Sequence, residues 1–362
     1  MLKAIQFAHP DYVVPTDDRA LGELHTLATD HPQYLELMVR SLGSSKSFEV
    51  VRSRVDLLEL AESLQIRTPR TVPLLTLQKA TSYANSWNYP AFVKRDGTFA
   101  GAGVAMVRTP PELVDAYRRL KRGAPLAVRL KRRLVDGDVF AFSPPPKRSS
   151  RQISLQTFVA GTPANAMYSC FQGKLLASLQ VSTLCAQHAT GAALIVKRLN
   201  DPRIQEAGKK IARALTLSGF FGLDFILEKG SGYPYLLEMN PRPTQLGHLP
   251  LENQSEGASL AETLWLAWTG NRSRKPTAPR TLPKLPERIA FYPQALMLGA
   301  NNPLLNSAYL DRPDQEPELL RELSKTLSPE RGLLHRLIHR FYIAHRKDPV
   351  VFPDSPQTPS RS

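Results

Sequence analysis

The chain of 362 residues is poor in cysteine and in long apolar runs. Its two cysteines, Cys170 and Cys185, form no metal-binding spacing and no disulfide framework, so we expect buried thiols in a reducing compartment. No apolar stretch reaches the roughly 20 residues that a membrane-spanning helix needs. The first residues also lack the charged and apolar regions of a secretory signal. These absences predict a cytoplasmic protein.

Acidic residues are in the minority, since 32 Asp and Glu stand against 47 Lys and Arg, which gives a formal net charge of +15. Much of the excess lies between Arg118 and Arg151, where Asp136 and Asp138 are the acids. A basic surface attracts anionic partners such as nucleotides, nucleic acid or acidic lipid, although a solvated basic face explains the charge equally well. Nucleic-acid binding is not favoured, because neither interleaved aromatic residues nor a helix-turn-helix pattern accompanies the charge.

Residues 220–242 carry the strongest functional signal. They predict two strands joined by a Lys-Gly-Ser-Gly turn, with Asp224 on the first strand and Glu238 and Asn240 on the second. Residues two apart in a strand share a face, so Glu238 and Asn240 point the same way. Two carboxylates and an amide oxygen suit Mg²⁺, which bridges phosphates, and Arg242 can bind a phosphate oxygen as a fork. The segment therefore predicts a nucleotide-phosphate site.

The same alternation predicts that Leu237 and Met239 point into a core. Elsewhere, Tyr12–Val14 is a short apolar run that ends at a proline and predicts a buried strand. Thr109 followed by Glu112 predicts a capping box at the start of a helix.

A second phosphate signature surrounds Lys94. This lysine ends a predicted strand and precedes a glycine-rich loop, 96–103, after which a second strand begins. Glycines let backbone N–H groups approach phosphate oxygens closely, and the lysine adds a point charge. The loop matches neither the phosphate loop that ends in Gly-Lys-Ser/Thr nor the dinucleotide fingerprint.

The two signatures, in this order, resemble the ATP-grasp superfamily from about Arg54 to His248. The resemblance rests on the stretches PAFVKRDGTFAGAGVAMV, LQTFVAGTPANAMYSCFQGKLLA and FGLDFILEKGSGYPYLLEMNPR. It implies an α/β protein in which two α+β subdomains grip ATP, with Mg²⁺ or Mn²⁺ as the metal. The implied site has phosphate contacts from Arg54 and Lys94, a covering loop with Gly101 and Gly103, an adenine-contacting stretch with Gln156, Thr157 and Val159, metal ligands Asp224, Glu238 and Asn240, and Lys94 and Arg242 as the catalytic cations.

Several positions depart from the family pattern. Arg54 stands where a lysine is usual, and 161–166 lacks the acid that often binds ribose, for which Asn165 is a candidate substitute. Only about fifty residues precede Arg54, which suggests a shortened N-terminal α/β domain. Asp17 and Asp18 would then contact substrate at a strand end, or simply cap a helix.

The resulting expectation has four parts: residues 1–53 as a partial α/β domain, 54–250 as the ATP-grasp domain, 251–347 as a mostly helical extension and 348–362 as a disordered tail. The last helix, 331–346, carries His335 and His339 four residues apart, which we interpret as surface histidines in preference to a metal pair. Its basic amphipathic pattern also allows binding to an anionic membrane, although packing on its own domain is the more common outcome.

The resemblance implies an ADP-forming ligase that activates a small carboxylate with ATP and passes it to an amine or a thiol. Biotin-dependent carboxylation is disfavoured because no acid follows in PRPTQLGH. The alternative is an inactive nucleotide-binding or interaction protein that docks on an anionic partner. Paired carboxylates weigh against that alternative, since burying them without a metal costs free energy.

Overall fold

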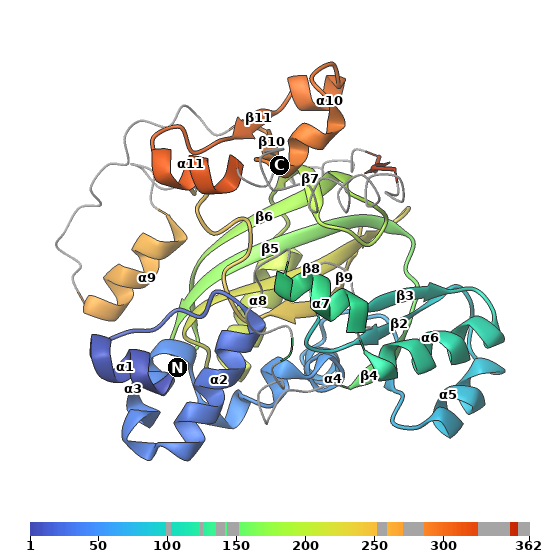
Figure 1. The fold of residues 1–362 in the computed structure, drawn as a ribbon, viewed down its shortest axis with the longest axis horizontal. Helices are drawn as coiled ribbons and strands as arrows, with labels where there is room; N and C mark the ends of the chain where they lie inside the picture. Colours follow the sequence, from blue (N-terminus) through green and yellow to red (C-terminus); the bar gives the residue numbers. More distant parts are fainter. Residues whose placement is uncertain are drawn as a thin grey trace.

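The computed structural model describes residues 1–98, 103–123, 126–134, 142, 152–251, 259–270, 286–324 and 348–353. It contains one four-stranded and one eight-stranded sheet with helices packed on both (Figure 1). The expected α/β class is therefore confirmed. Within these residues no helix is both long enough and apolar enough to cross a membrane.

Residues 1–53 form helices instead of a partial α/β domain. The helices are α1 (Leu2–Ala8), α2 (Asp18–Asp30) and α3 (Leu35–Leu42), followed by short 3-10 turns. The strand expected at Tyr12–Val14 is wrong. The backbone N–H of Val13 donates to the hydroxyl of Ser41 at 3.0 Å. A side chain thus accepts the hydrogen bond that a neighbouring strand was expected to accept.

Gly43 fixes this helical segment to the rest of the protein. It follows α3 with φ +98°, a conformation that favours glycine. A Cβ atom here would lie 2.3 Å from the carbonyl oxygen of Thr216. The next residue, Ser44, donates its N–H to that same oxygen at 3.1 Å. The N-terminal helices are thus tied to the loop after helix α8 (Pro202–Ala214).

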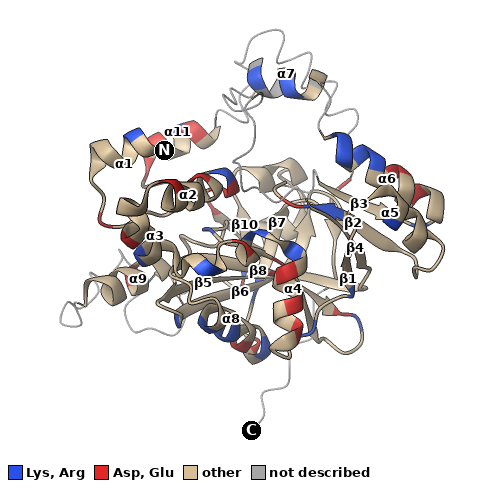
Figure 2. Ribbon diagram, turned by 90° about the horizontal axis from the view of Figure 1, so that it is seen from below, with Lys and Arg blue, Asp and Glu red and all other residues tan. Residues whose placement is uncertain are grey.

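The smaller sheet has the order β1-β4-β2-β3 and forms what we call the small lobe. Its elements are β1 (Thr71–Pro73), α5 (Leu77–Ala84), β2 (Ala91–Arg95), β3 (Val104–Val107), α6 (Pro110–Arg122) and β4 (Ile153–Thr157). The predicted cap is confirmed at Thr109, whose Oγ1 accepts from the Glu112 N–H at 3.4 Å, whereas the Glu112 carboxylate accepts from the N–H of Arg108, the residue before the cap, at 2.9 Å. Helix α7 (Leu126–Leu134) follows and stands away from both sheets (Figure 2).

The larger sheet has the order β11-β10-β7-β6-β5-β8-β9, and β12 pairs with β6. We call this sheet and its helices the large lobe. Its strands are β5 (Gly161–Phe171), β6 (Lys174–Ala186), β7 (Ala193–Leu199), β8 (Gly219–Glu228), β9 (Pro234–Asn240), β10 (Arg288–Phe291), β11 (Tyr309–Asp311) and β12 (Val350–Val351). Its main helices are α4 (Arg54–Ser63), α8 (Pro202–Ala214) and α9 (Leu260–Thr269).

The two faces of the larger sheet carry different cores. On one face Tyr168, Phe221 and Phe225 pack against α4 and α8. On the other face Met167 and Leu179 pack with the segment 246–251 and the start of α9. The strands are thus buried on both faces along much of their length, which explains the near-continuous apolar runs of β6 and β8.

In the C-terminal part, the described residues combine helices with strands. Helices α10 (Pro303–Asn306) and α11 (Pro317–Ser324) occur, but β10 and β11 extend the larger sheet. The tail expected to be disordered also contains β12, in which Val350 pairs with Ala186. The helix predicted at 331–346, with His335 and His339, lies outside the described residues.

Candidate functional site

The hairpin of β8 and β9 places the acidic residues as expected, but with a correction to its core face. Asp224 is paired directly with Glu238, and Gly222 with Asn240. An irregularity follows, so that Phe225 pairs with Leu236 and Leu237 is the extra residue of a β-bulge. Leu236 is therefore the fully buried leucine of β9, and the prediction that Leu237 enters the core is wrong.

Two amides converge on Asp224. Asn240 Nδ2 donates to Asp224 Oδ2 at 3.0 Å, and Asn165 Nδ2, from the neighbouring strand β5, donates to Asp224 Oδ1. Asn165 was a candidate for the missing ribose contact. The structure instead places its side chain at the carboxylate pair, because Asn165 and Asp224 are direct partners across β5 and β8.

Arg54 connects the two lobes. It is the first residue of α4, behind the N-cap Ser53. Its Nη1 donates to Asp96 Oδ1 at 2.8 Å, and its Nη2 and Nε donate to Glu238 Oε2 at 2.5 and 3.2 Å. Asp96 directly follows β2 of the small lobe, whereas Glu238 lies on β9 of the large lobe. A single guanidinium thus holds carboxylates from both sides of the cleft.

The electrostatics of the site follow from these contacts. Burial and the charge of Glu238 raise the pKa of Asp224, although the two amides oppose that shift. Burial would also raise the pKa of Glu238, but Arg54 and Lys94 more than offset it, so the pKa lies below its usual range. Glu238 is therefore the carboxylate that stays ionised.

Lys94 is buried on β2, with 6% of its surface exposed. Burial, with the charge of Arg54 acting in the same direction, lowers its pKa to about 8 in spite of the nearby carboxylates. Its ammonium lies 5.7 Å from the centre of the Phe92 ring. Because burial disfavours the charged form of Lys94, an anionic ligand beside it would stabilise that charged form strongly.

The loop and the adenine-contacting stretch are described only in part. Gly101 lies outside the described residues, whereas the carbonyl of Gly103 accepts from the Arg95 N–H at 2.9 Å. Gln156 is buried, and its Nε2 donates to Thr71 Oγ1 at 3.0 Å, so its side chain serves the small sheet. Thr157 and Val159 are half-buried at the connection to the large lobe.

Asp17 and Asp18 turn out to have different roles. Asp17 caps α2, since its Oδ1 accepts from the Ala20 N–H at 2.7 Å. Asp18 points to the site, where its Oδ1 accepts from Arg242 Nε at 2.9 Å. Arg242 also donates to Asn240 Oδ1 at 3.4 Å. The capping alternative thus holds for Asp17, and the N-terminal helices contribute Asp18 to the cleft.

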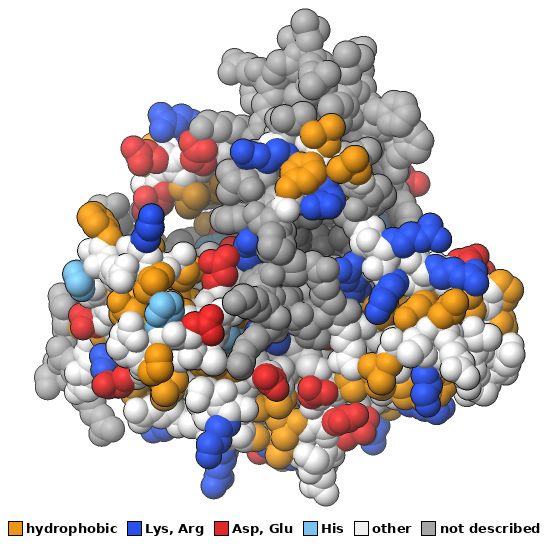
Figure 3. All heavy atoms as spheres, turned by 60° about the horizontal axis from the view of Figure 1, so that its bottom comes forward, with side chains coloured by type: hydrophobic (Ala, Val, Ile, Leu, Met, Phe, Trp, Pro, Cys, Tyr) orange, Lys and Arg blue, Asp and Glu red, His pale blue; other side chains and the backbone are white. Residues whose placement is uncertain are grey.

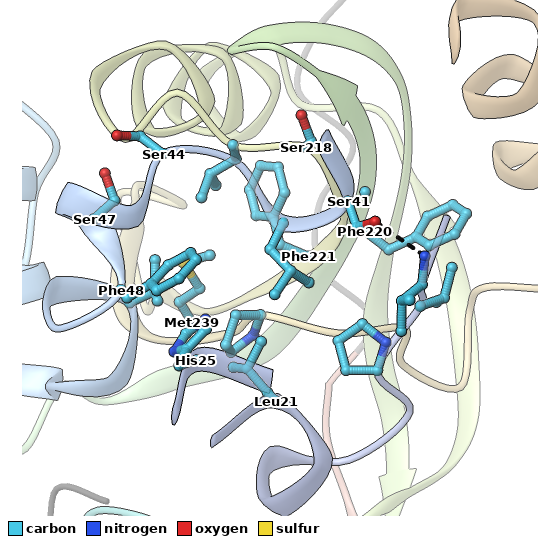
Figure 4. Close-up of a pocket in the computed structure, with 18 of the residues that line it drawn as sticks. Leu21, His25, Ser41, Ser44, Ser47, Phe48, Ser218, Phe220, Phe221 and Met239 are labelled. Carbon is cyan, nitrogen blue, oxygen red and sulfur yellow. Dashed lines mark hydrogen bonds between the residues drawn. The ribbon is translucent and has the colours of Figure 1, made fainter. Parts of the chain in front are cut away.

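Two cavities adjoin this cluster. A cleft pocket is lined by Asp18, Arg54, Asp96, Glu238 and Asn240 together with apolar residues. A second, mostly apolar cavity lies between the N-terminal helices and the β8–β9 hairpin, where His25 stacks on Phe48 near Leu21 and Met239 (Figure 4). Leu21 and Met239 also line the cleft pocket.

The donor set fits a hard cation. Asp224, Glu238 and Asn240 offer carboxylate and amide oxygens, and Asn165 Oδ1 is buried beside them without a hydrogen-bond partner among the described residues. No group of three or more His, Cys, Asp or Glu that could hold a metal occurs in the described part of the chain. A metal at this site would therefore also depend on amide oxygens and on ligand phosphates.

Sequence reasoning missed the role of Asp96. In the sequence, Asp96 precedes Gly97 and looks like an ordinary turn residue. Its partner Arg54 lies 42 positions away, so no local pattern reveals the contact. Of the basic stretch 118–151, the part in α6 contributes Lys and Arg side chains to the surface of the small lobe, at the right in Figure 3.

Comparisons with known proteins agree with this fold. Residues 146–245 match the family model described as an ATP-grasp domain. The chain is 22% identical over 232 residues to the carbamoyl phosphate synthase large chain of Pyrococcus furiosus, and 22% identical over 228 residues to that of Caldanaerobacter subterraneus. Each alignment covers 62% of this chain but only 19% of the relative.

Solved structures show the same fold at low identity. The biotin carboxylase domain of Hydrogenobacter thermophilus 2-oxoglutarate carboxylase, in complex with MgADP, ADP and bicarbonate, is 16% identical with a TM-score of 0.53, over 76% of this chain and 57% of that one. An N5-carboxyaminoimidazole ribonucleotide synthetase with ADP is 16% identical with a TM-score of 0.51, over 74% and 63% of the two chains. The domain match makes residues 146–245 similar to an ATP-grasp domain, and the fold shared with these structures agrees with that similarity.

Proposed function

We propose that this protein is an Mg²⁺-dependent, ADP-forming ligase. It transfers the γ-phosphoryl group of ATP to a small carboxylate, and an amine or a thiol then displaces phosphate from the acylphosphate. The observation that carries the proposal is the convergence of Arg54 and Lys94 with Asp224, Glu238 and Asn240 between the two lobes. The carbamoyl phosphate synthase relatives support a ligase, although this chain spans about a fifth of their length.

The residues of the chain have distinct roles in this proposal. Lys94, on β2 of the small lobe, and Arg54, at the start of α4, bind phosphate oxygens in the cleft. Arg242, held by Asp18, stabilises the phosphoryl group in transfer. Phosphoryl transfer passes through a loose transition state, so positioned charge supplies most of the catalysis and no protein nucleophile is required.

Asp224, Glu238 and Asn240 are the residues that would hold Mg²⁺. The ion would neutralise charge on the ATP phosphates. Asn240 Nδ2 faces Asp224, so the Oδ1 atom of Asn240 would bind the metal only after the side-chain amide flips. Asn165 faces Asp224 in the same way and keeps that carboxylate in place.

The proposal also divides the chain. Residues 54–250 would form the ATP-grasp unit, which includes the small lobe and the strands β5 to β9. Residues 1–53 would cover the cleft and supply Asp18. The substrates beyond ATP are a small carboxylate and an amine or thiol acceptor.

Thermal unfolding with and without Mg²⁺ and ATP tests this function. Ligand at a hundred times its dissociation constant adds about 2.7 kcal/mol of stability, which corresponds to a shift of several degrees. We expect the wild-type shift to require both Mg²⁺ and ATP, and Glu238→Gln to remove the Mg²⁺-dependent part. Glu59→Gln, an exposed carboxylate of α4, is the matched control and should keep the full shift.

The possible results separate the two functions considered. A shift that survives in Glu238→Gln contradicts the metal assignment. A folded wild-type protein that shows no shift contradicts the ligase proposal and favours the interaction protein. If the shift is found, release of ADP in the presence of candidate carboxylates and hydroxylamine, an amine that traps acylphosphates, identifies the substrate.

A further inference from the structure

Asp96 is a buried carboxylate to which neither the sequence motifs nor the proposed chemistry gives a role. It follows β2 and has 5% of its surface exposed. Its two oxygens accept from the same residue, because Oδ2 accepts from the backbone N–H of Arg54 at 3.3 Å and Oδ1 accepts from Arg54 Nη1 at 2.8 Å. One carboxylate thus fixes both the main chain and the side chain of Arg54.

The surrounding bonds join this contact to the small lobe. The N–H of Asp96 donates to the carbonyl of Gln152 at 2.9 Å, just before β4. Ser53, the N-cap of α4, donates its hydroxyl to Gln152 Oε1 at 3.2 Å. Asp96 and Gln152 therefore dock the first turn of α4 against β2 and β4, two residues from Lys94.

The charges in this cleft explain why a carboxylate is needed here. Arg54 and Lys94 are two cations with little exposure, and each raises the cost of burying the other. Glu238 compensates Arg54 from the large-lobe side. Asp96 compensates it from the small-lobe side and, unlike Glu238, belongs to no metal-ligand set, so it can hold Arg54 while Glu238 has other partners.

We propose that Asp96 is a positioning residue for phosphate recognition. It holds the guanidinium of Arg54 in the plane where its remaining N–H groups, together with Lys94, face the phosphates of a nucleoside triphosphate. Asp96 itself does not touch the ligand, because an anionic side chain would repel phosphate. This inference rests on the proposed function, in that the ligand is ATP.

The test compares ligands that share adenosine and differ in phosphate. Dissociation constants for ATP, ADP and adenosine are measured with Mg²⁺ for wild type and for Asp96→Asn, which keeps the shape but loses the charge. We expect Asp96→Asn to weaken ATP and ADP at least tenfold and to change adenosine binding by less than twofold. Asp56→Asn, an exposed carboxylate of the same first turn, should bind all three ligands as wild type does.

A second variant covers the case in which Asp96→Asn leaves an uncompensated buried cation and does not fold. The double variant Arg54→Gln/Asp96→Asn removes both charges. Since Asp96 acts through Arg54, we expect this double variant to bind ATP within twofold of Arg54→Gln alone. Additional weakening of tenfold in the double variant would show that Asp96 acts independently of Arg54 and would overturn the inference.

The remaining results separate this inference from the function beneath it. Equal losses for ATP and adenosine in Asp96→Asn would show a purely structural role and overturn the inference. Wild-type ATP affinity in Asp96→Asn would also overturn it and leave the ligase proposal standing. A wild-type protein that binds no ATP overturns both.

Discussion

Acidification should destabilise this protein through one buried histidine. His25 lies on α2 with 2% of its surface exposed, stacked on Phe48 with ring centres 3.8 Å apart. Its Nδ1 is buried without a hydrogen-bond partner among the described residues. Burial, reinforced by the charge of Arg52, lowers the pKa of His25 to about 3. The native protein therefore keeps this imidazole neutral.

The size of the effect follows from linkage. In the unfolded chain a histidine binds its proton near pH 6.5, so the unfolded state takes up a proton below that pH while the folded state does not. Stability is therefore fully present above about pH 6.5 and falls as the pH approaches 3. At about pH 5 the loss from His25 alone is about 2 kcal/mol.

Urea unfolding at about pH 7 and about pH 5, followed by circular dichroism, measures this loss. Other groups also titrate in that range, so the informative quantity is the difference between wild type and His25→Gln, which stays neutral at both pH values. We expect wild type to lose about 2 kcal/mol more than His25→Gln on acidification. His9→Gln, which changes an exposed histidine of the same helical segment, should behave as wild type.

Equal pH dependence in wild type and His25→Gln would refute the reasoning. It would mean that His25 is protonated in the native state, and hence that α2 does not pack over the hairpin as described. Because Leu21 and Met239 line both the His25 cavity and the cleft pocket, the result also tests the position of Asp18.

Two further predictions concern binding and backbone conformation. Burial and the charge of Arg54 lower the pKa of Lys94 to about 8, so Lys94 loses its positive charge as the pH rises. Calorimetry should therefore show ATP affinity falling about tenfold between about pH 7 and pH 9. Unchanged affinity over that range would contradict the phosphate-binding role of Lys94. In Gly43→Ala the new Cβ meets both a positive φ and a clash, whereas in Gly230→Ala it meets a similar φ of +96° but no atom within 4 Å. Urea unfolding should show that Gly43→Ala loses about 2 kcal/mol more stability than Gly230→Ala does. Equal losses in the two variants would exclude the clash at Gly43.

Local patterns predicted much of the site. The turn residues and the alternation around Glu238 and Asn240 depend on neighbours in sequence, and the hairpin formed as predicted. The strand at Tyr12–Val14 failed for a non-local reason, because a strand needs a partner and none of the described residues forms a strand beside it. The contact of Arg54 with Asp96 depends on two lobes meeting, which one sequence does not show.

Tertiary pairing also explains the C-terminal errors. Prolines and polar residues after Asp348 predicted disorder, yet Val350 and Val351 pair with Ala186 and Cys185, at the end of β6 beyond the residues that pair with β5. Strand β10 pairs with β7 and with β11, which are contacts between segments far apart in the sequence. In both cases an existing strand of the larger sheet supplied the backbone hydrogen-bond partner, which local strand propensity does not predict.

The bulge at Leu237 has a consequence for recognising sites of this kind. It separates two registers within one strand: from Glu238 onward the period of two holds, whereas Leu236 obeys the same period only when Leu237 is skipped. The spacing of Glu238 and Asn240 therefore follows the regular alternation of the strand, whereas the bulge adds one residue between the core leucine and the first acid. Relatives that lack the extra residue would keep both the leucine and the acid on their proper faces, and a search pattern with a rigid spacing upstream of Glu238 would overlook them.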